Sequence, residues 1–244
     1  MMNKLSFKKI SIGTWMQLND SNVAEILAAS GYDWVTIDLE HGEISNDKLC
    51  DHIRAIELYK KLPFVRCKYS DQQNIQIVVE AGAKGIFLPQ IKDSAHLKKL
   101  IKFAKLPPKG KRGIGFNRAN LYGKNFNAYI KDTSTPYIIP IIENLDSLND
   151  IDNILRVKNL DAIFIGPYDL SASLGITGEF KNKKYIDAIN YILSKAKQNK
   201  VTAGIHVVHP STKELKKSIK QGFKLIAYSM DSVFLGKGCD RPKI

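Results

Sequence analysis

Eight short apolar runs, separated by longer stretches with helical periodicity, restrict the fold of this chain more than any other feature. Each run is no more than eight residues long and rich in Ile, Val, Phe, Tyr or Thr, a pattern typical of buried parallel strands. The runs lie at residues 10–16, 34–40, 64–68, 85–90, 137–143, 162–166, 202–208 and 225–230.

The segments between the runs are predicted to be helices. Residues 22–29, 74–81 and 212–221 each end close to a glycine (Gly31, Gly82 and Gly222), which is the usual residue just after a helix C-terminus. Residues 146–157 begin with an Asp suited to an N-cap, and residues 183–198 carry apolar side chains at helical spacing.

Eight strand–helix units predict an α/β fold, a single (β/α)8 TIM barrel spanning 1–244 as one domain. The length of 244 residues is close to the ~250 typical of such barrels. A doubly wound open sheet is the alternative. It is disfavoured because no GxGxxG follows the first run and no strand–helix turn carries a P-loop.

The net charge of +13 raises the question of a nucleic-acid partner. Only six of the 37 basic residues are Arg, and the lysines are scattered along helical stretches, as on solvated helix faces. No nucleic-acid-binding motif accompanies the charge, so we expect no nucleic-acid partner. We also expect no membrane span, because no run approaches 18 apolar residues, and a cytoplasmic protein whose three distant cysteines stay reduced.

The ends of the predicted strands carry the polar residues expected of an active site, since barrel enzymes place their chemistry at the carboxyl-terminal rim. Glu143 and Asp169 follow neighbouring strands, and two such carboxylates could bind one Mg²⁺ or Mn²⁺. A 2-oxo acid could chelate that cation, which would stabilise an enolate. The structural alternative, equally compatible with the spacing, is that Asp169 caps a helix and Glu143 pairs with a lysine.

Three further residues follow the second and third runs. Asp38 lies three residues before His41, a spacing that allows a carboxylate to orient an imidazole as a general base, although a merely hydrogen-bonded histidine is at least as common. Arg66 ends an apolar strand, where burial is costly without an anion, so a substrate role is favoured for it. His206 and His209 flank the seventh run and stay unassigned, and Asp231 could support the rim or cap a helix.

The tight turn after the sixth run reads Gly166-Pro167-Tyr168-Asp169. Backbone N–H groups at such a helix start can receive a carboxylate, and a simple turn is equally compatible with these residues.

Six ordered motifs together resemble the 4-hydroxy-2-oxoheptanedioate aldolase family of the pyruvate-aldolase and citrate-lyase group. They are the stretch from Gly31 to Gly42, Phe64-Val-Arg, Glu80-Ala-Gly-Ala-Lys-Gly, Leu88-Pro-Gln, Lys111-Arg-Gly-Ile-Gly with Arg118-Ala, and the stretch from Ala162 to Ser171. The resemblance runs from about residue 13 to residue 235. It implies a TIM barrel, usually a homohexamer with exchanged C-terminal helices, that reversibly cleaves 4-hydroxy-2-oxo acids to pyruvate and an aldehyde.

The resemblance also implies roles for individual residues. Glu143 and Asp169 look like the ligands of a divalent metal, Mg²⁺ or Mn²⁺, with Co²⁺ as another candidate. His41, supported by Asp38, looks like the base. Arg66 looks like the group that steadies the pyruvate enolate, and the backbone from Gly166 to Asp169 looks like the site for the pyruvate carboxylate.

Two positions depart from the family. Ile141 stands where the family usually has a Gln, and an apolar side chain cannot replace an amide. Glu80 stands where the family often has an Asp that helps to orient the histidine across a subunit contact, a role that Glu could fill.

Three other functions are compatible with parts of the sequence. A Schiff-base aldolase would need a lysine inside the barrel, and Lys68, two residues after Arg66, is the one candidate near the strands. A citrate-lyase-like enzyme acting on a thioester would need an element to hold coenzyme A, and none is obvious. A non-enzymatic basic protein that binds nucleic acid is the third.

Overall fold

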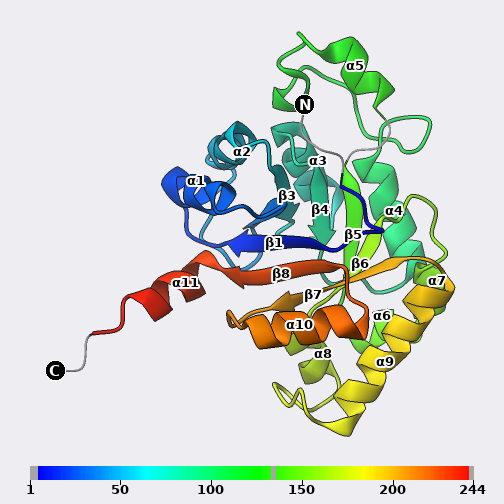
Figure 1. Ribbon diagram of the computed structural model, residues 1–244. Helices are drawn as coiled ribbons and strands as arrows, with labels where there is room; N and C mark the ends of the chain where they lie inside the picture. Colours follow the sequence, from blue (N-terminus) through cyan, green and yellow to red (C-terminus); the bar gives the residue numbers. More distant parts are fainter. Residues whose placement is uncertain (1–4, 133–135, 242–244) are drawn as a thin grey trace.

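In residues 5–132 and 136–241, which the computed structural model describes, eight parallel strands close into one barrel (Figure 1). Each strand pairs with the next in sequence, and β8 closes the ring against β1. The strands are β1 (Ser11–Met16), β2 (Trp34–Asp38), β3 (Leu62–Arg66), β4 (Gly85–Leu88), β5 (Tyr137–Ile142), β6 (Ala162–Ile165), β7 (Thr202–Val207) and β8 (Leu225–Met230).

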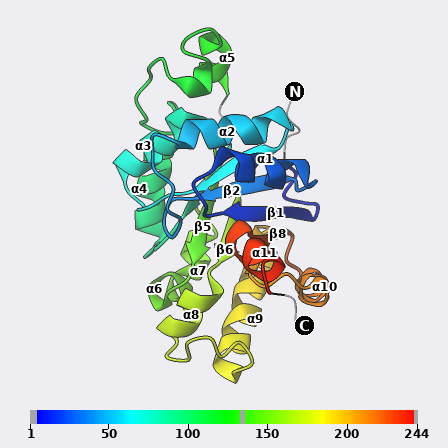
Figure 2. The same cartoon turned by 90° about the vertical axis from the view of Figure 1, so that its left-hand side faces the viewer.

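Helices lie around this barrel, and most of them cover its outer face (Figures 1 and 2). They are α1 (Ser21–Ala29), α2 (Leu49–Leu58), α3 (Gln72–Ala81), α4 (Ser94–Ala104), η1 (Arg118–Asn120), α5 (Phe126–Lys131), α6 (Leu145–Asn149), α7 (Ile151–Ile154), α8 (Pro167–Ser173), α9 (Lys183–Gln198), α10 (Thr212–Gln221) and α11 (Asp231–Gly238). The predicted (β/α)8 barrel is therefore confirmed.

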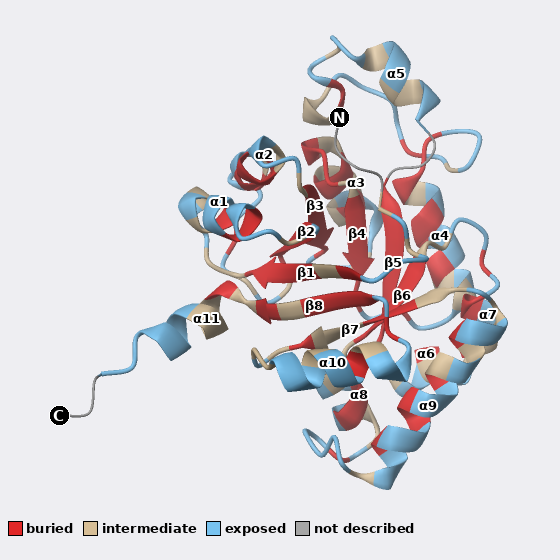
Figure 3. Cartoon of the chain, in the orientation of Figure 1, coloured by how far each residue is buried: buried red, intermediate tan, exposed pale blue. Residues whose placement is uncertain are grey.

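The apolar core has two layers, because successive residues of a strand face opposite sides of the sheet. Trp34, Phe64, Phe87 and Phe164 pack with other strand residues into a cluster inside the barrel. The second cluster joins the outer faces of the strands to the helices. Figure 3 shows the result, with buried strands at the centre and helices that are exposed on their outer sides.

Several element boundaries differ from those predicted. The second strand ends at Asp38 rather than at residue 40, because the Asp38 carboxylate accepts the backbone N–H groups of Glu40 and His41 and so starts a turn. The helix predicted at 146–157 is divided into α6 and α7. The N-cap of α6 is Asn144, whose side chain accepts the N–H of Ser147. Asp146, the expected N-cap, lies in the first turn of α6 instead.

The C-terminal helix α11 leaves the barrel from the end of β8 and extends away from it (Figures 1 and 2). Leu235 on this helix is 57% exposed. No helix in the described part of the chain is both long enough and apolar enough to cross a membrane.

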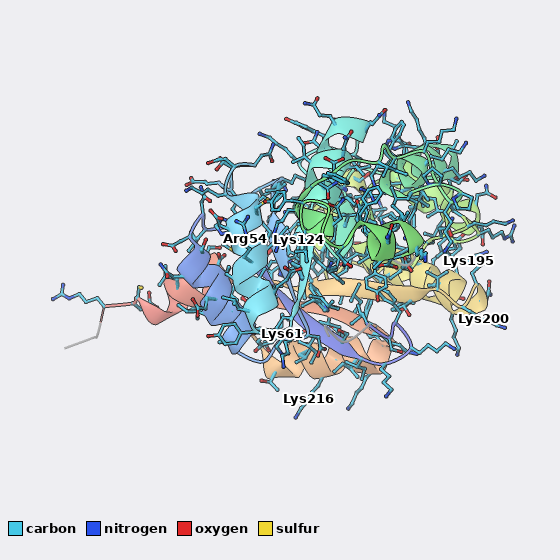
Figure 4. All side chains as sticks on the ribbon, turned by 90° about the horizontal axis from the view of Figure 1, so that it is seen from above. Arg54, Lys61, Lys124, Lys195, Lys200 and Lys216 are labelled. Atoms are coloured by element: carbon cyan, nitrogen blue, oxygen red, sulfur yellow. The ribbon has the colours of Figure 1, made fainter. Side chains whose placement is uncertain are left out.

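The basic residues are distributed over many elements. Figure 4 labels six of them, which are spread across the view rather than gathered at one place: Arg54, Lys61, Lys124, Lys195, Lys200 and Lys216. Lys195 forms an ion pair with Asp152. Arg54, Lys195 and Lys216 lie on helices, as expected from the sequence, whereas Lys61, Lys124 and Lys200 lie in turns or loops.

Gly13→Ala is expected to destabilise the barrel by about 2–3 kcal/mol, because a new Cβ overpacks the core. An added Cβ would lie 2.0 Å from the indole ring of Trp34. That ring is fully buried and stacked on Phe64 with 5.4 Å between centroids, so it cannot move away from an added Cβ without displacing other core side chains. The free energy of unfolding in urea measures the effect.

Gly113→Ala is the matched control, since its Cβ would meet no atom within 4 Å, and a change within about 0.5 kcal/mol is expected. Equal stability of the two variants would contradict the packing described here.

Candidate functional site

A pocket of about 290 Å³ opens at the carboxyl-terminal rim of the barrel. His41, Arg66, Glu143 and Asp169, four of the residues predicted for catalysis or metal binding, line it together. The rest of the lining is largely apolar or aromatic. The structure thus brings residues separated by more than one hundred positions into a single cavity.

Arg66 is the most firmly held group in the pocket. Its Nε and Nη2 donate to the two oxygens of Asp38 at 2.8 and 2.6 Å, and its Nη1 lies 3.0 Å from Glu40 Oε2. The guanidinium carbon also lies 4.5 Å from the centroid of the Trp15 ring, a cation–π contact. Two acids and an aromatic face therefore fix the guanidinium in one orientation.

The pKa values of the two acids beside Arg66 are shifted in opposite directions. Burial raises the pKa of Asp38, but hydrogen bonds from Arg66 and Gln17 outweigh it, and the pKa is lowered overall. Glu40 has a raised pKa because burial outweighs its attraction to Arg66 and His41. Asp38 is consequently easier to ionise than a free aspartate, and Glu40 is harder to ionise than a free glutamate.

Glu143 follows β5 and is almost completely buried, with 2% exposure. Its Oε1 accepts the backbone N–H of Gln90 at 2.5 Å, so it does not form the lysine pair considered from the sequence. A Cβ at Gly166 would lie 2.8 Å from Glu143 Oε2, so only glycine fits beside this carboxylate. The pKa of Glu143 is raised to about 7, mainly by burial and also by the negative charges of Glu40 and Asp169, while the hydrogen bond from Gln90 opposes the shift.

Asp169 lies in the first turn of α8 and lines the same pocket. The N-cap of α8 is Gly166, with Pro167 at the first helical position, so the capping role considered for Asp169 is wrong. Gly166, Pro167 and Tyr168 also line the pocket. The turn lies where a bound carboxylate was predicted, and that role stays a prediction.

His41 is exposed at the rim and lines the pocket. Asp38 does not orient its ring as expected. Among the described residues, the Asp38 carboxylate is hydrogen-bonded by Arg66, Gln17 and the backbone N–H groups of Glu40 and His41. Asp38 therefore positions the loop that carries His41, and the role of His41 as a base stays a prediction.

Two other predicted residues lie outside the pocket. Lys68 is exposed beyond the end of β3, with its Nζ 6.0 Å from the ring centroid of Tyr69, and no lysine lines the described pocket. The expectation that Lys68 points into the barrel beside Arg66 is wrong. Glu80 lies near the end of α3 that precedes β4, opposite the rim, and accepts a hydrogen bond from Gln76. Its predicted role needs a second subunit and stays a prediction.

Sequence reasoning missed Gln17, which follows β1. Its side-chain Nε2 donates to Asp38 at 3.0 Å, and its side-chain oxygen accepts from Ser232 at 3.1 Å. Its backbone N–H donates to Asp231, which is the first residue of α11. The position of Gln17 directly after a predicted strand, at the rim where an active site is expected, could have identified it from the sequence. Trp15 and Glu40, which lie in or beside the pocket, were also missed, and His206, left unassigned from the sequence, lines the pocket.

The donors in the pocket fit a divalent metal held by two carboxylates. Glu143 Oε2 and Asp169 offer hard oxygen donors, which Mg²⁺ and Mn²⁺ prefer, and the crowding of acids that raises the pKa of Glu143 would be relieved by a cation. In the described ranges, no group of three or more acidic, His or Cys side chains forms a fuller metal site. A two-carboxylate site leaves the remaining coordination positions for water and substrate.

Comparison with known proteins gives a consistent result. The family described as HpcH/HpaI aldolase/citrate lyase matches residues 11–236. A 2-keto-3-deoxy-L-rhamnonate aldolase from Klebsiella pneumoniae is 29% identical over 94% of this chain and 86% of its own length. A hydroxypyruvate/pyruvate aldolase from Roseobacter denitrificans is also 29% identical, over 95% of this chain and 90% of its own.

Two solved structures are similar along nearly the whole chain. A HpcH/HpaI aldolase/citrate lyase family protein from Burkholderia cenocepacia superposes with a TM-score of 0.89 at 27% identity, covering 94% of this chain and 91% of its own. The citrate synthase SbnG superposes with a TM-score of 0.82 at 26% identity, covering 94% and 90%.

Metal affinity is expected to fall about tenfold for each pH unit below about 7. The pKa of Glu143 in the metal-free protein is raised to about 7, so below that pH the metal must displace a proton from the carboxyl group. Above it the carboxylate is already ionised, and the affinity should level off. Calorimetric titration with Mn²⁺ between pH 5.5 and 8.5 measures this.

Glu143→Gln is the control for this titration. Its amide oxygen can still accept the N–H of Gln90, but the charge is lost, so weak binding is expected at every pH. An affinity that stays constant from pH 5.5 to 7 would show that Glu143 does not titrate with the metal.

Proposed function

Because the chain belongs to the HpcH/HpaI aldolase/citrate lyase family, we propose that it is a metal-dependent aldolase that reversibly cleaves 4-hydroxy-2-oxo acids to pyruvate and an aldehyde. The observation that supports this best is the meeting of Glu143, Asp169 and Arg66 in one rim pocket. Related proteins over nearly the same length are named as aldolases, which places the reaction among carbon–carbon lyases.

Glu143 and Asp169 would hold the divalent cation, Mg²⁺ or Mn²⁺. The bound cation supplies a Lewis acid that favours the enolate form of pyruvate. Glu143 is prepared for this role, because the N–H of Gln90 fixes one oxygen and the space beside Gly166 leaves room for the other. The two side chains come from neighbouring strands, so the barrel sets their separation.

Arg66 would stabilise the negative charge that develops on the oxo acid. A guanidinium has five N–H donors. Asp38 accepts from two of them, and Glu40 forms an ion pair with Nη1 at 3.0 Å. The other donors are held at a fixed orientation, so the stabilisation requires little reorganisation during the reaction.

His41 would act as the base at the mouth of the pocket. In the cleavage direction it takes the proton of the 4-hydroxyl group, the bond between C3 and C4 breaks, and the aldehyde leaves. The electron pair of that bond forms the enolate, which then takes a proton at C3 to give pyruvate. Glu40 interacts with the charge of His41, so an acid already lies beside the proposed base.

Ile141 lines the same pocket, buried beside Glu143 and Phe164. The floor is therefore apolar where the family usually presents an amide. The oxo acid would therefore gain no hydrogen bond from an amide at this position.

Pyruvate methyl-proton exchange in D2O, followed by NMR, tests the proposed function without knowledge of the aldehyde. Exchange is expected with Mg²⁺ or Mn²⁺ and is expected to disappear with chelator. Glu143→Gln and Asp169→Asn should abolish it, and Arg66→Lys should slow it on the order of 10²-fold, because one preorganised donor is displaced.

Lys68→Ala is the control and should exchange at the wild-type rate, since Lys68 lies outside the pocket. Exchange that persists in chelator, together with borohydride trapping of pyruvate on a lysine, would replace this mechanism with a Schiff-base one. Metal uptake without exchange would favour the thioester-cleaving alternative.

We also propose that the enzyme is a homohexamer in which α11 docks on a neighbouring subunit. The helix extends away from its own barrel with Leu235 exposed, and the segment around η1 presents Phe116 at 72% and Tyr122 at 65% exposure. Such apolar surface is typical of a protein interface.

Light scattering after gel filtration is expected to give six times the 27.4 kDa chain mass. Leu235→Asp is expected to shift the protein to smaller species, since a charge would be buried in the contact. Lys237→Asp, a charge change on the same helix at an already basic position, is a matched control for surface charge. A wild-type monomer would rule the assembly out.

A further inference from the structure

The pocket is divided between two groups of strands. The ionisable side chains His41, Arg66, Glu143 and Asp169 lie at or beyond the ends of β2, β3, β5 and β6. A second wall comes from β7, β8 and β1 and consists of Trp15, His206, Val208 and Met230, with Gln17 at its edge. Given the proposed function, on which this inference rests, the oxo acid occupies the charged side, and the aldehyde must lie against the second wall.

His206 is the one titratable side chain on this second wall. Its ring stacks on Trp15 with 5.1 Å between centroids and 27° between planes. Its Nε2 lies 3.1 Å from the carbonyl oxygen of Ser229 on β8. A carbonyl can only accept a hydrogen bond, so Nε2 carries the hydrogen and Nδ1 carries the lone pair.

The ring is neutral at physiological pH. Burial lowers the pKa of His206 to about 4, and the positive charge of Arg66 acts in the same direction, while the bond to Ser229 opposes them. Among the described residues, Nδ1 has no hydrogen-bond partner. Gln17 has both of its amide atoms engaged, by Asp38 and Ser232. His206 Nδ1 is thus an uncommitted acceptor in a wall that is otherwise apolar.

We propose that His206 is a specificity-determining residue whose Nδ1 accepts a hydrogen bond from a hydroxyl group of the aldehyde. The preferred aldehydes are then those with a hydroxyl group close to the carbonyl, and the preferred cleavage substrates are dihydroxy-2-oxo acids. An aldehyde with a methyl group in place of the hydroxyl leaves Nδ1 without a partner, which binding sites penalise.

Glycolaldehyde and propanal form a matched pair of probes, since they have the same number of heavy atoms and differ by a hydroxyl in place of a methyl. The measurement is the kcat/KM of each aldehyde in condensation with pyruvate, expressed as the ratio of the two. Comparison of this ratio between variants removes the difference in intrinsic reactivity of the aldehydes.

His206→Leu is expected to lower the ratio about tenfold or more, since it removes the acceptor and keeps an apolar side chain of similar reach. His206→Asn, whose amide oxygen can stand near the position of Nδ1, is expected to recover part of the ratio. His209→Leu is the control, because His209 is exposed and lies outside the pocket, and it should keep the wild-type ratio.

Failure of this inference is distinguishable from failure of the proposed function. If the wild type exchanges pyruvate protons but His206→Leu keeps the wild-type ratio, the role of His206 is overturned and the aldolase stands. If the wild type fails to exchange pyruvate protons with any divalent metal, the proposed function itself is overturned. A ratio that falls in His206→Leu and returns in His206→Asn supports the hydrogen bond.

Discussion

The paired hydrogen bonds between Arg66 and Asp38 are the interaction on which the rest of the site depends. Burying a guanidinium is costly, and only a well-oriented carboxylate offsets that cost. Asp38 supplies it through both oxygens and also accepts the N–H groups that turn the chain towards His41. The Asp38 carboxylate thus fixes both the Arg66 guanidinium at the end of β3 and the loop after β2 that carries His41. The positions of these two proposed reacting groups therefore depend on the same side chain.

The acids around this pair set the electrostatic character of the pocket. Besides burial, the charges of Glu40 and Asp169 raise the pKa of Glu143, and the charges of Asp38 and Asp169 raise that of Glu40, with Arg66 as the opposing charge. Concentrated negative charge in a buried place is unfavourable for the empty protein. The same arrangement favours a divalent cation. The repulsion between the acids in the empty pocket and the expected affinity of the pocket for metal therefore have the same cause.

The barrel could be predicted from the sequence because its signals are local. Apolar runs mark the strands, and glycines mark the ends of helices, and both can be recognised without knowing which strands pair. The sequence also predicted that Arg66, Glu143 and Asp169 would meet, because the rim of a barrel collects strand ends. It did not predict the function of Gln17, whose backbone contact is with Asp231, 214 residues away. The expectations that Asp38 orients the ring of His41 and that Lys68 faces the interior failed for a related reason. Both assumed that nearness in sequence sets direction, whereas Arg66 competes for Asp38 and β3 ends before Lys68.

The division of the pocket between two sets of strands has a consequence for how such a protein can diversify. Arg66 is held by Asp38 and Glu40, and Glu143 is held by the backbone N–H of Gln90, so neither residue is easily replaced alone. The wall from β7, β8 and β1 carries apolar side chains, such as those of Val208 and Met230, which form no salt bridges. Single substitutions on that wall can therefore change the hydrogen-bond acceptor that faces the aldehyde. The residues on the opposite side of the pocket, and the reaction proposed for them, would be unaffected.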